Sequence, residues 1–142
     1  MSEPDLTPGE WQGIFRKARA LLDNGWCIDT MATDKYGTPV PYSDERAACF
    51  CILGAVGRAL HDEKKLFGRW RAHVDPLLEP CIPAGAYLGE DGDEATVAAY
   101  NDHACASVSD AIALLDAAIA RSMPGVLTRR DVIDGPIVTA SV

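Results

Sequence analysis

The sequence has no lysine or arginine between Arg71 and Arg121. Residues 72–120 hold nine Asp and Glu residues and carry a charge of -9, whereas the rest of the chain sums to +1 and brings the total to -8. Such a one-sided field repels nucleic acid and anionic membrane surfaces, and it attracts basic surfaces. We call residues 72–120 the acidic segment. A basic cluster in residues 58–71 also contains two acidic residues, so we expect it to pair with the acidic segment or to face water. We therefore expect a basic protein partner and no direct binding to nucleic acid.

The sequence also lacks a recognisable leader and a long apolar run. Its first ten residues contain no basic stretch followed by an apolar one, so no signal peptide is visible. The longest apolar run, residues 47–57, is too short to cross a bilayer. The five cysteines are scattered and odd in number, unlike those of a secreted disulfide scaffold. We expect a cytoplasmic protein with reduced thiols and no membrane contact.

Motifs that bind nucleotides or metals are missing too. There is no G-x-x-x-x-G-K-[ST] sequence, and Gly54 and Gly57 lie in an apolar run where glycine serves close packing. We predict that Cys49 and Cys51 share one helix, where residues two apart point to nearly opposite sides and cannot readily grip one ion. The acidic run 90–94 lacks the ligand order of an EF-hand. We expect no metal and no cofactor.

Helical periodicity is what the sequence does contain. Its 142 residues are the usual size of one domain. Thr7-Pro8-Gly9-Glu10 forms a capping-box pattern, and an apolar face follows it as far as Leu22. Asn24-Gly25 ends this helix, and we expect the glycine to take positive φ.

Further helices are predicted over residues 47–60, 66–78, 94–101 and 107–123. We expect Ser43 to cap the first of these helices. Pro76 should break or restart the second. Ser107-Val108-Ser109-Asp110 is another capping-box pattern and opens the last helix.

The region after the first helix has a different pattern. Trp26–Ile28 and Thr38–Val40 flank the turn-like sequence Asp34–Gly37, which indicates a short hairpin or a structured loop. We therefore predict a mainly α fold: a single compact domain of four to five helices, with a small β-hairpin or structured loop after the first helix. This helical domain spans residues 1–123, and an extended C-terminal tail spans 124–142.

Cys27 is the candidate nucleophile. It follows a Gly-Trp pair in a loop, and Asp102 and His103 lie downstream. A catalytic cysteine needs an imidazole to form its thiolate and a third group to orient that imidazole. The sequence thus allows a small cysteine-dependent hydrolase or transferase that uses Cys27 with His103 and Asp102. No family-specific signature surrounds Cys27, so a half-buried structural cysteine is the competing interpretation.

Three short blocks carry a resemblance: Gly25-Trp26-Cys27, Cys51-Ile52-Leu53-Gly54-Ala55, and Tyr100-Asn101-Asp102-His103 ahead of the apolar segment 112–119. Over roughly residues 18–120 the chain resembles an uncharacterised family of small phage and actinobacterial proteins with a G-W-C, C-L-L-G-A and W-N-D pattern. The resemblance implies a phage or bacterial cytoplasm and no established activity. It also implies that Cys27, Asn101 and Asp102 lie near one another. The latter two side chains would tie down the Trp26 loop by hydrogen bonds to its backbone.

Our leading functional hypothesis is a non-catalytic interaction protein that presents an acidic face to a basic macromolecule. The residues predicted to contact the partner are Glu90, Asp91, Asp93 and Glu94. In a phage or mobile element, the partner would be a host nucleic-acid-binding protein that this chain inhibits. Simple solubility is the competing interpretation of the acidic segment.

Overall fold

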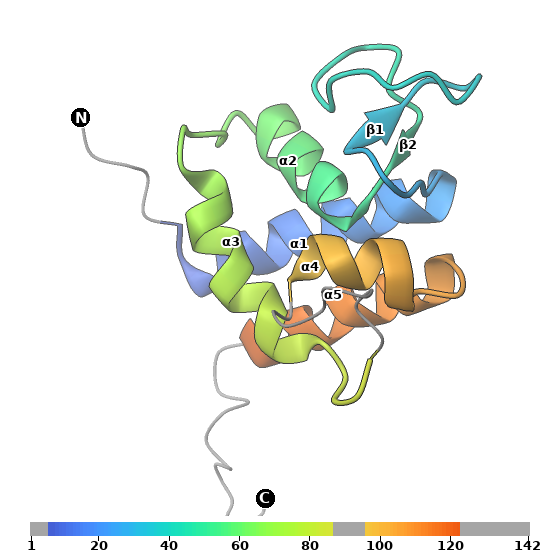
Figure 1. The fold of residues 1–142 in the computed structure, drawn as a ribbon. Helices are drawn as coiled ribbons and strands as arrows, with labels where there is room; N and C mark the ends of the chain where they lie inside the picture. The colour runs from blue at the N-terminus through green and yellow to red at the C-terminus, as the bar shows by residue number, and fades with distance from the viewer. Residues whose placement is uncertain (1–5, 87–95, 123–142) are drawn as a thin grey trace, which may run out of the picture.

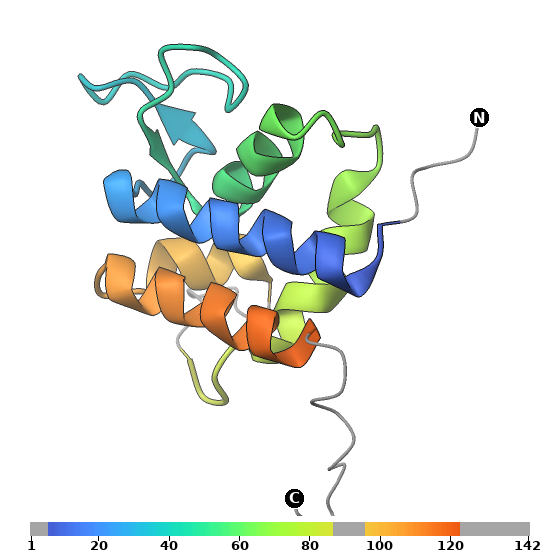
Figure 2. The same cartoon turned by 180° about the vertical axis from the view of Figure 1, so that it is seen from behind.

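Two layers of helices make up the computed structural model, which describes residues 6–86 and 96–122. Helices α1 (Pro8–Asn24) and α5 (Val108–Ser122) lie side by side and antiparallel in one layer, as Figure 2 shows. Helices α2 (Ile52–Asp62), α3 (Trp70–Leu78) and α4 (Val97–Ala99) form the other layer (Figure 1). The predicted mainly α, single-domain fold with a small β element after the first helix is confirmed.

The start of α1 is as the sequence predicted. The Thr7 hydroxyl accepts a hydrogen bond from the Glu10 amide at 3.1 Å, and the Glu10 carboxylate accepts one from the Thr7 amide at 2.8 Å. These bonds, the backbone one first, lower the pKa of the Glu10 carboxyl. The predicted apolar face is buried and consists of Trp11, Ile14, Phe15, Ala18 and Leu22.

Gly25 ends α1 for a reason other than the one predicted. Its φ is -179°, which is extended backbone that any residue adopts, so the expected positive φ was wrong. A Cβ at this position would collide with the carbonyl oxygen of Ala48 and lie 2.8 Å from the Cys49 sulfur. Glycine is required here because the backbone at Ala48 and Cys49 passes directly over it.

The β element pairs different segments from those predicted. Strand β1 (Ala32–Thr33) is antiparallel to β2 (Cys49–Phe50), with Ala32 opposite Phe50. The predicted strands 26–28 and 38–40 contribute isolated bridges through Trp26 and Pro39. The predicted turn between them is confirmed, since the Asp34 carboxylate accepts hydrogen bonds from two backbone amides of that turn at 2.9 Å.

Helix α2 begins at Ile52, so the prediction of a helix from residue 47 was wrong. Its N-cap is Cys51, whose sulfur accepts a hydrogen bond from the Gly54 amide at 3.2 Å, and Ser43 lies outside the helix. Cys49 belongs to β2, so the two cysteines do not share a helix. The error has a physical cause, because the apolar strand β2 runs directly into a buried helix and the two give one continuous apolar run.

The glycines of α2 allow the close approach that the sequence indicated. A Cβ on Gly54 would collide with the backbone carbonyl of Met31. A Cβ on Gly57 would lie 2.9 Å from the Tyr42 ring and 3.0 Å from the Trp70 ring. These contacts bring the loop after α1 and the start of α3 directly against the α2 backbone.

Helix α3 is shorter than predicted and is not broken by its proline. It starts at Trp70 and continues through Pro76 to Leu78, where the 3-10 turn η1 (Glu79–Cys81) follows. Proline removes one backbone donor from the helix. Burial of Trp70, Val74 and Leu78 along one face offsets that loss, because tertiary packing supplies most helical stability.

The chain changes helical type after α4. Thr96 caps α4 by accepting a hydrogen bond from the Ala99 amide, and the chain then continues as the π-helical turn η2 (Tyr100–Ala104). Within the described residues the predicted helix over 94–101 is therefore displaced and differently wound, since it begins at Val97 and continues to Ala104, and Glu94 lies outside those residues. At the next helix start, Asp110 accepts from the Ala106 amide, one residue earlier than a capping box requires.

The C-terminal helix is described as far as Ser122. Its buried face is made of Ala111, Leu114, Leu115, Ala118 and Ile119. Met123 and the predicted tail 124–142 lie outside the described residues. No helix in the described ranges is long and apolar enough to cross a membrane.

Candidate functional site

Asn101 is a buried polar side chain that joins three segments of the chain. It is 0% exposed. Its side-chain oxygen accepts hydrogen bonds from the Trp26 indole N–H at 2.9 Å and from the Ile52 amide at 3.1 Å. Its side-chain NH₂ donates to the Cys27 carbonyl at 3.2 Å and to the Asp102 carboxylate at 3.0 Å. Both acceptor positions and both donors of the amide are therefore used.

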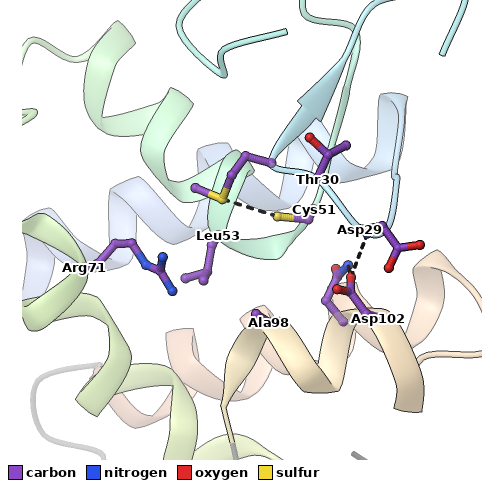
Figure 3. Close-up of a pocket in the computed structure, with 9 residues that line it drawn as sticks. Asp29, Thr30, Cys51, Leu53, Arg71, Ala98 and Asp102 are labelled. Carbon is purple, nitrogen blue, oxygen red and sulfur yellow. Dashed lines mark hydrogen bonds between the residues drawn. The ribbon is translucent and has the colours of Figure 1, made fainter. Parts of the chain in front are cut away.

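Asp102 extends this junction to the loop after α1. Its Oδ1 accepts the Asn101 bond and a second hydrogen bond, from the Asp29 amide, at 3.0 Å (Figure 3). Asp29 has φ of 67°, a left-handed conformation that few residues other than glycine adopt. The expected cluster of Cys27, Asn101 and Asp102 is thus present, and it holds the Trp26 loop as the resemblance implied.

The π turn presents these two side chains. Asn101 and Asp102 are consecutive, and both reach the 26–29 loop from η2. π-helical turns are rare in proteins, and those that occur are frequently found at functional sites. We call the set of Trp26, Cys27, Asp29, Asn101 and Asp102 the polar junction.

A cavity of about 190 Å³ opens beside the polar junction. Its lining comes from the loop after α1, the start of α2, helix α3 and the α4–η2 segment, and comprises Asp29, Thr30, Met31, Cys51, Leu53, Arg71, Ala98, Asn101 and Asp102. Figure 3 shows Arg71 on one side of this cavity and the two aspartates on the other. Leu53 and Ala98 lie between them.

Arg71 was not singled out as a site residue from the sequence. In the sequence, Arg71 ends a basic cluster, and none of the residues next to it indicates a cavity. In the structure, Arg58 of that cluster pairs with Asp62 at 3.1 Å, and Lys65 pairs with Glu10 at 3.6 Å. Arg71 is exposed and forms no ion pair within the described residues. Arg71 could not be found from its neighbours in the sequence, because it lies across the cavity from the 29–31 loop only once α3 has packed in the folded structure.

The Cys27 thiol is partly buried and bonds to its own loop. It donates to the Thr30 carbonyl at 3.7 Å. Burial raises the pKa of Cys27 to about 12, with further contributions from Cys51, Cys49 and Asp102. A nucleophilic cysteine needs the opposite shift, which a neighbouring imidazolium provides. His103 is exposed on η2, and Asp102, the third member of the candidate triad, bonds to the Asp29 backbone.

The four predicted partner-binding residues, Glu90, Asp91, Asp93 and Glu94, lie outside the described residues. The described part of the acidic segment still shows how some of its charges are used. Asp116 pairs with Arg19 at 2.7 Å, and Asp110 binds a backbone amide. Within residues 6–86 and 96–122, no group of three or more His, Cys, Asp or Glu side chains is arranged to hold a metal ion.

The fold and the site define a small, mainly α protein built around a polar junction with a cavity beside it. Residues 7–121 match a family described as a family of unknown function, DUF6197. The chain belongs to this family. Comparison with curated proteins and with solved structures finds no match.

Proposed function

We propose that this chain is a non-catalytic interaction protein whose acidic segment binds a basic macromolecule. The distribution of charge carries the proposal. Residues 6–86 and 96–122 contain eleven Lys and Arg against thirteen Asp and Glu, so the described fold is close to neutral. Glu90, Asp91, Asp93 and Glu94 alone contribute half of the total net charge of -8. A local field of this kind accelerates association with a positive surface.

The non-catalytic part of the proposal rests on the polar junction. The polar side chains of the junction form hydrogen bonds within the protein. Asn101 uses all of its hydrogen-bonding capacity, and Asp102 accepts a hydrogen bond from the Asp29 amide. A cysteine with a pKa near 12 is almost wholly protonated at neutral pH. In a phage or mobile element, the basic partner would be a host nucleic-acid-binding protein whose DNA-facing surface the acidic segment covers.

The test is capture of partners from a bacterial lysate by the tagged full chain, at low and at high salt, with the captured proteins identified by mass spectrometry. We expect basic proteins that are released as salt rises, because exposed charges are screened over about 8 Å at physiological ionic strength. Changing Glu90, Asp91, Asp93 and Glu94 to their amides should abolish the capture. A lysate that yields no salt-sensitive basic protein would contradict the proposal.

A matched pair of variants tests where the charge must lie. Asp91→Asn with Asp93→Asn removes two charges from the acidic segment. Asp23→Asn with Glu45→Gln removes two exposed charges from elsewhere on the fold. We expect the first pair to weaken binding and the second to leave it nearly unchanged. Equal losses would show that only total charge matters, which would favour the solubility interpretation.

The cysteine-dependent enzyme remains the second candidate, and Cys27→Ser separates it from the first. Serine keeps the size of the side chain and removes the thiol. If the interaction proposal holds, Cys27→Ser binds the captured partner as well as the natural chain does. Loss of biological activity in Cys27→Ser alone, with the helical circular dichroism spectrum retained, would favour the enzyme instead.

A further inference from the structure

The cavity beside the polar junction has a positive side and a negative side. Arg71 enters from α3, and Figure 3 shows its guanidinium directed toward Leu53. Asp102 lies across the cavity, with Asp29 beyond it. Burial raises the pKa of Cys51, and charges on both sides of the cavity make smaller contributions to it: Asp102 raises it and Arg71 lowers it.

The charged groups on both sides retain capacity for a ligand. Arg71 has no ion pair within the described residues, and neither has the Asp29 carboxylate. Asp102 uses its Oδ1 for the Asp29 and Asn101 bonds, and no hydrogen bond to its Oδ2 is found in the described part of the chain. The polar junction therefore fixes one carboxylate oxygen and leaves the other for a donor.

The backbone of this side is also fixed in advance. Asp29 is held at positive φ by its bond to Asp102, and Asn101 holds the Cys27 carbonyl two residues earlier. Residues held in sparsely populated conformations occur frequently at binding sites, where the surrounding structure enforces them. The Asp29 backbone and the Asp102 carboxylate are thus held in place before a ligand binds.

We propose that this cavity binds an apolar α-amino acid in its zwitterionic form. The ligand carboxylate pairs with Arg71, whose planar guanidinium suits bidentate carboxylate recognition. The ligand ammonium binds Asp102 and Asp29. The ligand Cα, which carries both charged groups, then lies between the two charged sides, and the ligand side chain lies over Leu53 and Ala98, which Figure 3 shows there.

Charge and size together select this class of ligand. A simple anion would meet two carboxylates, and a simple amine would meet the guanidinium, whereas a zwitterion satisfies both sides. A cavity of 150 Å³ is known to hold benzene. A volume of about 190 Å³ therefore suits an amino acid with a short apolar side chain and is too small for a nucleotide.

The experiment is an NMR titration of the ¹⁵N-labelled full chain with L-alanine, L-valine, L-leucine and L-methionine in turn. Each is taken to about 10 mM, a concentration at which even a millimolar complex is mostly formed. We expect saturable shifts confined to the amides around the cavity, those of residues 29–31, 51–53, 71 and 98–102. No saturable shift there with any of the four would overturn the proposal.

Two analogues of leucine test the two charged ends. N-acetyl-L-leucine lacks the ammonium, and L-leucinamide lacks the carboxylate. Each analogue should bind at least tenfold more weakly than L-leucine. An analogue that binds as tightly as its parent would show that the corresponding side of the cavity is not used, and the zwitterion proposal would fail.

Variants test the same ends on the protein. Arg71→Met keeps the apolar stem of the side chain and should weaken binding at least tenfold, with Arg71→Lys intermediate. Asp29→Asn should also weaken binding, and asparagine tolerates positive φ. The control is Arg16→Met, which removes an exposed arginine of α1 and should bind like the natural chain. Unchanged affinity in Arg71→Met, with the fold retained by circular dichroism, would refute the assignment.

This inference is independent of the proposed partner function. The fourfold neutral variant of residues 90, 91, 93 and 94 should bind the amino acid as the natural chain does, even where it captures no partner. Arg71→Met should conversely capture the basic partner normally. Failure of one proposal therefore leaves a distinct result for the other.

Discussion

The α1–α5 pair and the polar junction are held together by different kinds of interaction. The helix pair buries Ile14, Phe15 and Leu22 of α1 against Leu114 and Leu115 of α5. The attraction between such side chains is non-directional and scales with the buried apolar area. At its margin, Arg19 and Asp116 form an ion pair that is roughly half exposed, and such pairs contribute little.

The polar junction depends instead on a few directional contacts. One amide side chain, Asn101, serves a tryptophan ring, a helix start and a loop carbonyl. Beside it, the Met31 carbonyl rests on the bare backbone of Gly54. A region that is stabilised by its buried apolar area should tolerate exchange of one apolar side chain for another. A region held by single hydrogen bonds and close backbone contact should not tolerate even isosteric change.

Asn101→Leu should have the largest effect. The change conserves approximate size, but it leaves the Trp26 indole N–H and the buried Ile52 amide without their acceptor. Each orphaned buried donor costs about 1–3 kcal/mol, so we expect a loss of about 3–5 kcal/mol in the free energy of unfolding. Urea denaturation measures it. Asn24→Leu, at the exposed end of α1, is the control and should change stability by less than about 0.5 kcal/mol. Equal losses in both variants would remove the distinction between the two regions.

Gly54→Ala should have the next largest effect. The added Cβ collides with the Met31 carbonyl, which belongs to the backbone and cannot rotate away. Overpacking of this kind costs about 1–3 kcal/mol. Gly13→Ala is the matched change on α1, where nothing lies within 4 Å of the new Cβ, and it should stabilise the protein by about 0.5–1 kcal/mol. Thermal unfolding should therefore shift in opposite directions for the two variants. A stabilised Gly54→Ala would refute the close contact.

Leu114→Met tests the tolerance of the helix pair. Leu114 is 2% exposed, and methionine has nearly the same volume and more flexibility. We expect a loss of less than about 1.5 kcal/mol, well below that of Asn101→Leu, in the same urea assay. A loss as large as that of Asn101→Leu would mean that the helix pair is as specific as the polar junction.

The smallest effect at neutral pH is expected from Cys27→Ala and should appear only in alkali. The folded state raises the pKa of Cys27 from 9.0 to about 12. The folded protein therefore holds a proton that the unfolded chain releases above pH 9, so this contribution to stability is complete below pH 9 and is lost as pH rises toward 12. Urea midpoints measured from pH 7 to 11 should fall above pH 9, and they should fall less steeply in Cys27→Ala. Identical pH profiles would contradict the raised pKa.

Sequence patterns predicted elements whose signals are local. The Thr7–Glu10 capping box, the Asp34 turn and the apolar faces of α1 and α5 are each set by residues within a few positions of one another, and all are present. The predicted start of α2 was wrong because the apolar residues Cys49 and Phe50, of which only Phe50 is buried, form a strand that runs directly into the helix. Hydrophobic periodicity does not mark the boundary between a strand and a helix when the residues of both are apolar on every side.

The candidate site was predictable only in part, for a related reason. The meeting of Cys27, Asn101 and Asp102 followed from a family resemblance, because no spacing rule connects residues more than 70 positions apart. The role of Arg71 and the left-handed conformation of Asp29 depend on how α3 and η2 fold against the loop after α1. Such contacts are properties of the assembled tertiary structure, and no local pattern contains them.

The sequence separations at Asn101 have a kinetic consequence. Its bonds to Trp26 and Ile52 span 75 and 49 residues, so neither can form until α1, α2 and η2 have been brought together. Closing such long loops is entropically costly and belongs to the later stages of folding. Loss of these bonds should then leave the folding rate nearly unchanged and raise the unfolding rate. On this account Asn101 determines the lifetime of the native state, and the apolar helices determine how quickly the chain reaches it.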